Sequence, residues 1–347
     1  MTEMLSPNLS PPLDQASFDR IMHNYADHIK NAPVLAIGVS GGGDSMALAH
    51  LLANHCAAHG KELHILSVNH QLRDAAQSEV EQVGAWVKDW PNTSHHILNW
   101  VHEQKPDSRI QESARSARYD LLGAHCKQHN IDALFLAHHL DDQYETFLMR
   151  LTSGSGLKGL AAMAEVTSVD DKASHKIAKI RPLIHYTHQD LIHYCQASGI
   201  NWIEDPSNQD THYKRVRFRK AAAFLSEEGL STSRVDRLIT RIDRANTALA
   251  YYTAQELKEV TINSAPSGYI LDFEKFTALP AEIGLSILAQ IMREIQKSVP
   301  SYPPSAEKLE SLYARIVNNQ QPFQGATLYK CQFSLKDKGR SLHIVQE

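Results

Sequence analysis

Residues 34–52 read VLAIGVSGGGDSMALAHLL. The first six residues are largely apolar and rich in β-branched side chains, which is typical of a buried strand. Leu48, Leu51 and Leu52 then recur with helical spacing, so the polar stretch joins a strand to a helix. At such a junction, unpaired N–H groups and the positive helix end favour phosphate oxygens, and glycines let the backbone approach them. The residues of this glycine loop, which we expect to bind phosphate, are Ser40, Gly41, Gly42, Gly43, Asp44 and Ser45.

Asp44 distinguishes this loop from the common P-loop. The spacing from Gly38 through Gly43 to Ser45 imitates that motif, but the P-loop requires a phosphate-binding lysine where Asp44 stands. A carboxylate that faces a polyphosphate repels it unless Mg²⁺ lies between them. We therefore expect the loop to bind ATP and Asp44 to bind Mg²⁺, the alternative being a plain tight turn.

Further apolar runs predict more strands of the same sheet. They lie at residues 63–68, 97–101, 134–137 and 177–180, and helical stretches separate most of them. Strands that alternate with helices predict right-handed crossovers and a doubly wound α/β domain, with a parallel sheet covered on both faces. Ligands of such sheets bind at the carboxyl ends of the strands, near the point where the strand order switches.

The pattern changes after about residue 220. Val235, Leu238, Ile239 and Ile242 follow the spacing of an amphipathic helix, and residues 283–295 and 309–316 predict two more. Residues 327–345 predict a hairpin that turns near Gly339. We therefore expect a catalytic domain at residues 1–218 and a mainly helical domain with a small β tail at residues 219–347.

Composition narrows the functional classes. The chain has 347 residues, 42% of them hydrophobic, and a formal net charge of −4, which does not itself favour nucleic acid but leaves room for a local basic patch. No apolar run reaches the roughly 20 residues that span a bilayer, so we expect no membrane partner and a cytoplasmic location. Four scattered cysteines form no Cys-x-x-Cys pair for zinc, an iron–sulfur cluster or a redox couple: Cys56, Cys126, Cys195 and Cys331.

A second group of polar residues follows the strand at residues 134–137. His138, Asp142 and Glu145 have the spacing i, i+4 and i+7, which predicts one shared helix face. Such a face offers carboxylates to an ammonium group or a metal, and an imidazole to a phosphate or a proton transfer. The alternative is an acidic helix start that only stabilises the helix dipole. Zinc is disfavoured, because His138 and the adjacent His139 would point to different faces of a helix.

Basic residues elsewhere suit phosphate groups. His70 and Arg73 follow the second predicted strand, and Arg115 and Arg118 lie on a helix that we expect to begin near Ile110. Each could contact phosphate or simply be solvated. The densest positive run interleaves with Phe218 and suits a polyanion, with a basic hinge helix as the alternative. Its candidate RNA-binding residues are Lys214, Arg215, Arg217 and Arg219.

Taken together, these segments resemble the PP-loop ATP pyrophosphatases and, among them, the tRNA(Ile)-lysidine synthetase family. The resemblance is collinear over most of the first two thirds of the chain, and residues 221–347 resemble the family only weakly. Where the family usually has an Arg-Asn pair before the second domain, this chain has Arg215 and Val216.

The resemblance implies a complete reaction. The family uses ATP to join L-lysine to carbon 2 of the wobble cytidine (position 34) in a tRNA-Ile with a CAU anticodon, and it releases AMP and pyrophosphate. Asp142 and Glu145 are expected to bind the lysine ammonium, and Arg118 and His138 to hold the adenylated base. His70, Arg73 and Arg115 join the glycine loop in the expected ATP site. The second domain is expected to associate with tRNA, and the oligomeric state stays open, a homodimer included.

Two other functions remain as alternatives. Another PP-loop enzyme, such as a tRNA base thiolase, begins with the same adenylation but needs suitably placed thiols, whereas the cysteines here are scattered. A regulator that binds nucleotide or RNA without turnover could keep the glycine loop, because a fold does not fix a function. It would have little reason to retain Asp142 and Glu145 together with a basic run.

Overall fold

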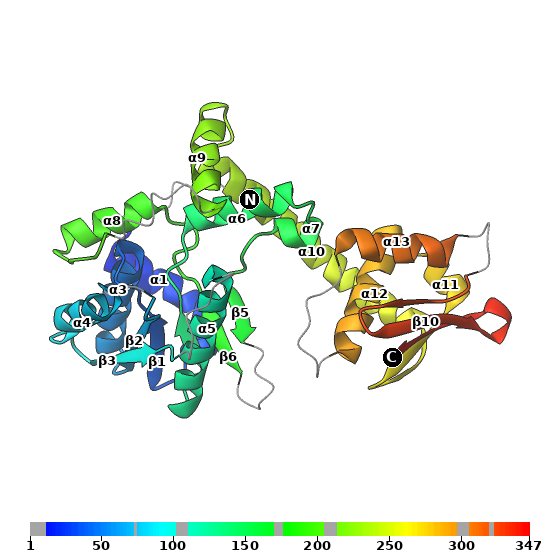
Figure 1. Cartoon of the computed structure of the whole chain (residues 1–347), viewed down its shortest axis with the longest axis horizontal. Helices are drawn as coiled ribbons and strands as arrows, with labels where there is room; N and C mark the ends of the chain where they lie inside the picture. The colour runs from blue at the N-terminus through cyan, green and yellow to red at the C-terminus, as the bar shows by residue number, and fades with distance from the viewer. Residues whose placement is uncertain are drawn as a thin grey trace, which may run out of the picture. The chain divides into compact units, whose positions relative to one another are not determined.

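The computed structural model describes residues 12–72, 75–101, 110–169, 176–204, 214–296, 305–318 and 323–347. The chain divides into two compact units (Figure 1). The first contains Met1–Thr146 and Met163–Asp236, and the second contains Phe147–Ala162 and Arg237–Glu347. The change of unit falls within the long helix α10 (Thr232–Val260). The functional boundary between residues 218 and 219 stays a prediction.

The first unit is built on a six-stranded sheet, which confirms the predicted α/β fold. All neighbouring strands are parallel except β5 and β6, which are antiparallel. The edge strand β5 was not predicted from the sequence. In spatial order the strands are β3 (Thr93–Asn99), β2 (Glu62–Asn69), β1 (Val34–Gly38), β4 (Ala133–Phe135), β6 (Ile177–Ile180) and β5 (Val166–Val169).

Helices cover both faces of this sheet, as expected. Leu35 and Ile37 of β1 lie in one apolar core, whereas Ala36 lies in a second core together with Leu122 of α5. This alternation is what a strand buried on both sides requires. The helices that lie wholly in this unit are α1 (Gln15–Met22), α2 (Ala26–Ile29), α3 (Gly43–Ala58), α4 (Ala75–Val87), α5 (Ile110–Gln128), α8 (His188–Ala197) and α9 (Lys214–Glu227), with a 3-10 turn η1 (His23–Tyr25).

The strand order switches between β1 and β4. These strands are neighbours although β2 and β3 separate them in the sequence. The loops that follow β1 and β4 therefore leave the same edge of the sheet side by side. The first is the glycine loop, and the second leads into α6 (Leu140–Thr152). The fold thus brings the two predicted groups of polar residues to one place, where sheets of this type bind ligands.

The second unit combines helices with a five-stranded antiparallel sheet in the order β7-β8-β11-β10-β9. The predicted tail hairpin is confirmed by β10 and β11. The hairpin of β7 and β8 was not predicted, because β7 reads TINSA and is largely exposed. The elements that lie wholly in the second unit are α7 (Leu157–Leu160), β7 (Thr261–Ala265), β8 (Gly268–Asp272), α11 (Phe273–Ala278), α12 (Ala281–Ile295), α13 (Ala306–Val317), β9 (Ala326–Leu328), β10 (Cys331–Lys336), η3 (Asp337–Gly339) and β11 (Ser341–Gln346).

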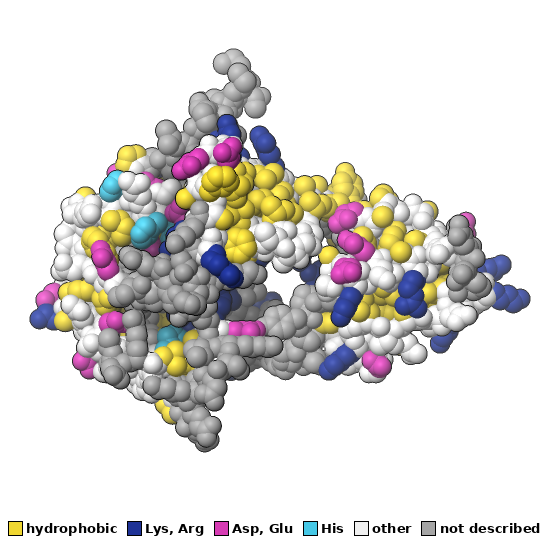
Figure 2. Space-filling view, turned by 45° about the horizontal axis from the view of Figure 1, so that its top comes forward, with side chains coloured by type: hydrophobic (Ala, Val, Ile, Leu, Met, Phe, Trp, Pro, Cys, Tyr) yellow, Lys and Arg dark blue, Asp and Glu magenta, His cyan; other side chains and the backbone are white. Residues whose placement is uncertain are grey.

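Charge is mixed on the face of the molecule that Figure 2 shows. Figure 2 shows both basic and acidic side chains on the visible face, in keeping with the small net charge. A tRNA partner therefore has to be argued from local groups of residues. Among the described residues, no helix is long and apolar enough to cross a membrane.

Candidate active site

The glycine loop has a backbone that larger residues would disturb. Gly41 has a φ of +88°, and a Cβ atom there would lie 2.9 Å from Cδ1 of Ile203. A Cβ atom on Gly43 would lie 2.4 Å from Cδ1 of Ile192. Because L side chains rarely adopt such a φ, glycine is needed at position 41, whereas a side chain at position 43 would have to displace the terminal methyl of Ile192.

Two serines close the loop. The hydroxyl of Ser45 donates to the carbonyl oxygen of Gly42 at 2.9 Å, and the backbone N–H of Ser40 donates to the same hydroxyl at 3.3 Å. Gly42 is the N-cap of α3 and provides no side-chain cap. The first-turn N–H groups of α3 thus face the loop without a carboxylate or hydroxyl cap, which suits an anionic ligand.

Asp44 lies in the first turn of α3 and contacts two histidines. Its Oδ1 lies 2.7 Å from Nδ1 of His188, and its Oδ2 lies 3.5 Å from Nε2 of His139. Burial alone raises the pKa of Asp44, but the hydrogen bonds and positive charges of His139 and His188 hold it well below its ordinary value. Asp44 is therefore ionised over the whole physiological pH range.

His139 is the buried centre of the site, with an exposed side-chain fraction of 7%. Its ring nitrogens lie 3.4 Å from Oδ2 of Asp141 and 3.6 Å from Oδ2 of Asp142. Burial disfavours the charged imidazole, but the surrounding carboxylates prevail and raise the pKa of His139 to about 10. An imidazolium thus neutralises part of a cluster of three carboxylates, those of Asp44, Asp141 and Asp142.

Three of these residues were missed in the sequence. His139 was considered only beside His138, when zinc was disfavoured, and Asp141 and His188 were not considered. The available signal was the position of His139 and Asp141 directly after β4, beside the glycine loop. His188 had no local signal, because it begins α8, far along the chain; its backbone N–H donates to Asp141 at 2.7 Å.

The helical spacing predicted for His138 needs a correction. Helix α6 begins at Leu140, so Asp142 and Glu145 lie on it, whereas His138 lies in the preceding loop. The strand ends at Phe135, and the chain reaches α6 only after four further residues. His138 is thus placed next to the site by the loop and not by a shared helix face.

Glu145 is paired with one of the predicted RNA-binding residues. Its side chain is 3% exposed, and Nε of Arg219 on α9 donates to its Oε1 at 2.7 Å. Burial disfavours the charge of Arg219, but Glu145, Asp142 and Asp141 raise its pKa above the ordinary value. Of the same run, Arg217 is exposed, while the side chains of Lys214 and Arg215 lie outside the described residues.

The other predicted phosphate-binding residues lie after the end of β2 and along α5. Arg118 donates from Nη2 to Nε2 of His70 at 3.3 Å. Burial and the charge of Arg118 lower the pKa of His70 to about 4, so its ring is neutral and can accept this bond. Arg115 lies over the ring of Tyr119, 5.2 Å from its centre. Arg73 lies outside the described residues.

The donor atoms of the site fit a divalent cation. Mg²⁺ is usually held by one or two carboxylates together with water and phosphate oxygens. Asp44, Asp141 and Asp142 supply such carboxylates around His139. Asp44, His139 and His188 also bring one atom each within 4.8 Å of one another, but the protonated ring of His139 has no lone pair for a metal, so carboxylates are the better ligands here.

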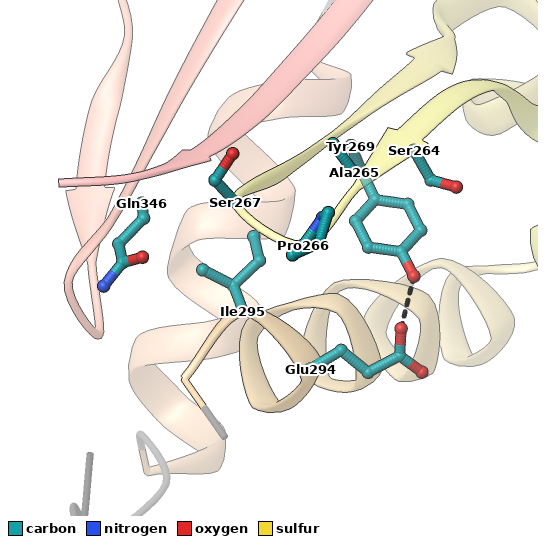
Figure 3. Close-up of a pocket in the computed structure, with 8 residues that line it drawn as sticks. All are labelled: Ser264, Ala265, Pro266, Ser267, Tyr269, Glu294, Ile295 and Gln346. Atoms are coloured by element: carbon teal, nitrogen blue, oxygen red, sulfur yellow. Dashed lines mark hydrogen bonds between the residues drawn. The ribbon is translucent and has the colours of Figure 1, made fainter. Parts of the chain in front are cut away.

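A separate hollow of about 590 Å³ lies in the second unit (Figure 3). The hydroxyl of Tyr269 donates to Glu294 at its edge. The hollow contains none of the predicted site residues. The residues that line it are Ser264, Ala265, Pro266, Ser267, Tyr269, Glu294, Ile295 and Gln346.

Comparisons with known proteins agree with this geometry. Residues 13–223 match the family model described as the PP-loop domain. The tRNA(Ile)-lysidine synthase of Wolbachia sp. subsp. Brugia malayi is 33% identical over 96% of this chain and 74% of its own length. The synthase of Wolbachia pipientis wMel is 33% identical over 90% of this chain and 70% of its own length.

Among solved structures, the U34-tRNA thiolase NcsA from Methanococcus maripaludis is similar in fold. Its TM-score is 0.54 with 17% identity, and the match covers 65% of this chain and 78% of that chain. At this identity the likeness concerns the fold alone. The PP-loop match and the alignments with the lysidine synthase relatives extend over most of the chain and identify its family more narrowly than the fold does. The chain therefore belongs to the tRNA(Ile)-lysidine synthase family of PP-loop proteins.

Proposed function

We propose that this protein uses ATP to join L-lysine to carbon 2 of the wobble cytidine (position 34) in tRNA-Ile with a CAU anticodon. The observation that carries the proposal is that the glycine loop after β1 and the carboxylates after β4 meet at the switch point of a PP-loop sheet. An anion-binding loop and acidic side chains beside it suit a reaction between a triphosphate and an amine. The lysidine synthase relatives supply the choice of amine and RNA.

The glycine loop would hold the phosphates of ATP. The N-terminal turn of α3 and the close backbone around Gly41 and Gly43 support this role. Arg118 and His70 lie together near the end of β2 and would contact the nucleotide or the adenylated base. We assign Arg73, Arg115 and His138 to the same nucleotide site on the strength of the family resemblance.

Mg²⁺ would be held by Asp44, with Asp141 or Asp142 as a second carboxylate. Bound there, it would neutralise the phosphate charge that builds up as pyrophosphate leaves. His139 and His188 keep Asp44 ionised, so that carboxylate is ready to bind a cation at neutral pH. His139 also holds the three carboxylates close to one another, which positions them for both the cation and the substrate amine.

The proposed reaction has two steps. The carbonyl oxygen at carbon 2 of cytidine attacks the α-phosphate of ATP, and the bond to pyrophosphate breaks. The ε-amine of lysine then attacks carbon 2, loses a proton, and displaces AMP. Adenylation is needed because the unactivated carbonyl oxygen is a poor leaving group, and the enzyme contributes by holding the amine next to carbon 2.

Asp142 and Glu145 would bind the lysine ammonium before the second step. Glu145 already accepts a cationic donor, the guanidinium of Arg219, so its surroundings favour a positive charge. Arg219 would have to move or share this carboxylate when lysine binds. Because Arg219 belongs to the basic run with Lys214, Arg215 and Arg217, contact of that run with tRNA would give it another anion to pair with.

The test is pyrophosphate release by the purified protein with Mg²⁺, ATP and unmodified tRNA-Ile (CAU), with and without lysine. Incorporation of radiolabelled lysine is followed in parallel. We expect lysine-dependent labelling, and we expect it to fall at least about 100-fold in Asp142→Asn and in Glu145→Gln. Glu227→Gln, an exposed glutamate on α9, removes the same charge and is expected to leave labelling intact.

The other outcomes separate the alternatives. Pyrophosphate release without labelled RNA would reject lysine as the nucleophile and favour thiolation, a function for which the four buried cysteines offer no exposed thiol. Absence of pyrophosphate release with any RNA would favour a binding protein. The cytoplasmic location and a homodimer stay predictions.

A further inference from the structure

A cluster of histidines lies on the face of the sheet that α5 covers. Residues i and i+2 of a strand share one face, so His64 of β2 lies on the same face as Leu66, and His96 of β3 on the same face as Leu98. Leu66 and Leu98 belong to the core around α5. His125 lies near the end of α5, and His129 follows that helix and donates its backbone N–H to the carbonyl of His125 at 3.1 Å. Two strands and a helix end thus bring four imidazoles together.

The four rings converge on one point. The centres of His64, His96, His125 and His129 lie between 4.3 and 5.9 Å apart in every pair. One nitrogen each of His64, His125 and His129 lies within 4.8 Å of the other two. Around a tetrahedral zinc ion with Zn–N bonds of about 2.1 Å, ligand nitrogens lie about 3.4 Å apart. Small side-chain movements would therefore bring these nitrogens to metal-binding distance.

The surroundings of His64 match those of a metal ligand. Its Nδ1 lies 3.0 Å from Nε2 of His125, inside the cluster, while its Nε2 lies 3.4 Å from Oε1 of Glu62. In a metal-bound histidine, the ring nitrogen that does not bind the metal commonly donates to a carboxylate, which orients the ring and makes the other nitrogen a stronger donor. Glu62 also accepts a hydrogen bond from Ser94 at 3.3 Å, and Ser94 contacts His96.

His125 and His129 have the spacing i and i+4, by which a helix presents two imidazoles to one metal ion. His125 and His64 are each 7% exposed, whereas His129 is exposed and leaves an approach from solvent. Neutral imidazole nitrogens are common ligands of transition metals, so the four rings offer a suitable set of donors.

We propose that His64, His125 and His129 bind a divalent transition-metal ion, Zn²⁺ in the first place, with His96 as the fourth ligand. Imidazole donors in this number select zinc, copper or nickel and not Mg²⁺. The bound ion would tie the end of α5 to β2 and β3. It would thereby brace the helix whose earlier turns carry Arg115 and Arg118. The site lies apart from the Asp44 and His139 cluster, with which it shares no residue.

The experiment uses the full chain without an affinity tag, freed of metal by a chelator. Titration with Zn²⁺ is followed by calorimetry and by the melting temperature, in the protein carrying Asp44→Asn so that the cluster at Asp44 is disabled. We expect one equivalent to bind and to raise the melting temperature. His129→Gln, at an exposed position, is expected to weaken binding at least tenfold, and His125→Gln/His129→Gln to abolish it.

A matched control removes two exposed histidines elsewhere, His28→Gln/His193→Gln, and is expected to bind Zn²⁺ as the parent does. Co²⁺ in place of Zn²⁺ should give the strong visible absorption of a tetrahedral nitrogen site. Equal Zn²⁺ binding in His129→Gln and the parent would overturn the proposal, as would the weak absorption of octahedral Co²⁺ or no stoichiometric binding. His129→Gln keeps the test valid if the double variant fails to fold.

Discussion

Gly43 is a position of the glycine loop at which a side chain would meet a neighbour. An alanine Cβ atom there would lie 2.4 Å from the terminal methyl of Ile192, and Gly43 begins α3, whose first turn faces the proposed phosphates. We expect Gly43→Ala to lower the free energy of unfolding by about 1 kcal/mol, because the half-buried side chain of Ile192 has to move to make room. Urea unfolding and ATP binding should both show the loss.

Gly123→Ala is the matched control for this prediction. Gly123 lies within α5, and a Cβ atom there would have no neighbour within 4 Å. Because alanine favours a helix over glycine by about 1 kcal/mol, we expect this variant to be more stable than the parent. Equal effects of the two substitutions would mean that packing at Ile192 does not explain the glycine at position 43.

His139 predicts a pH dependence of stability. Its pKa is about 10 in the folded protein against an ordinary value of 6.5 in the unfolded chain, so the folded state binds the proton more tightly. The stabilisation is complete below pH 6.5 and is lost as the pH rises towards 10. We expect the free energy of unfolding, measured in urea at both ends of this window, to fall less with pH in His139→Gln than in the parent.

His185 contributes over the same window and serves for comparison. It lies 3.0 Å from Glu165 and 3.1 Å from Asp236, whose carboxylates raise its pKa to about 10. His185→Gln should therefore also flatten the profile, and the two variants together should flatten it further. A profile that His139→Gln leaves unchanged would show that the carboxylates after β4 do not hold His139 protonated.

At the scale of elements, the ion pair of Arg219 with Glu145 joins α9 to α6. Arg219 is half exposed and Glu145 is buried, so loss of the guanidinium leaves a buried carboxylate with one partner fewer. A double-mutant cycle of Arg219→Ala and Glu145→Gln should give a coupling of about 1 to 3 kcal/mol in the free energy of unfolding. Arg217→Ala, on the same helix and exposed, should show almost no coupling to Glu145→Gln. A coupling near zero for both arginines would mean that the contact of Arg219 with Glu145 adds nothing to the free energy of unfolding.

The sequence predicted elements well where their periodicity was strong. The run at residues 34–39 became β1, Ile177–Ile180 was predicted with its observed ends, and the spacing of Val235 and Leu238 correctly indicated α10. β7 was not predicted, because its residues are mostly exposed and polar and show no alternation of apolar and polar side chains. Its strand conformation depends on its pairing with β8. His138 was assigned to α6 because a helix start is poorly marked when no capping residue precedes it.

On the scale of the whole chain, the site could be predicted only in part, because it joins residues of the first unit that lie far apart in the sequence. The glycine loop, Asp142 and Glu145 were found from local patterns. The contacts of Asp44 with His139 and His188 join residues far apart in the sequence, and no local pattern reports such contacts. The switch in strand order predicts which loops meet, but not which of two adjacent histidines faces the neighbouring loop.

The division into two units predicts how the chain responds to cutting. Every buried residue of the core in the second unit, from Leu257 to Ile344, lies within Arg237–Glu347, and both cores of the first unit lie before residue 201. Since a segment with its own apolar core can fold alone, we expect the fragment Arg237–Glu347 to unfold cooperatively in a thermal melt followed by circular dichroism. Residues 1–236 contain every residue assigned to the active site, so that fragment should retain ATP binding. A fragment Arg237–Glu347 without cooperative unfolding would show that its sheet needs the rest of the chain, Phe147–Ala162 included, and that the two cores do not make two independent domains.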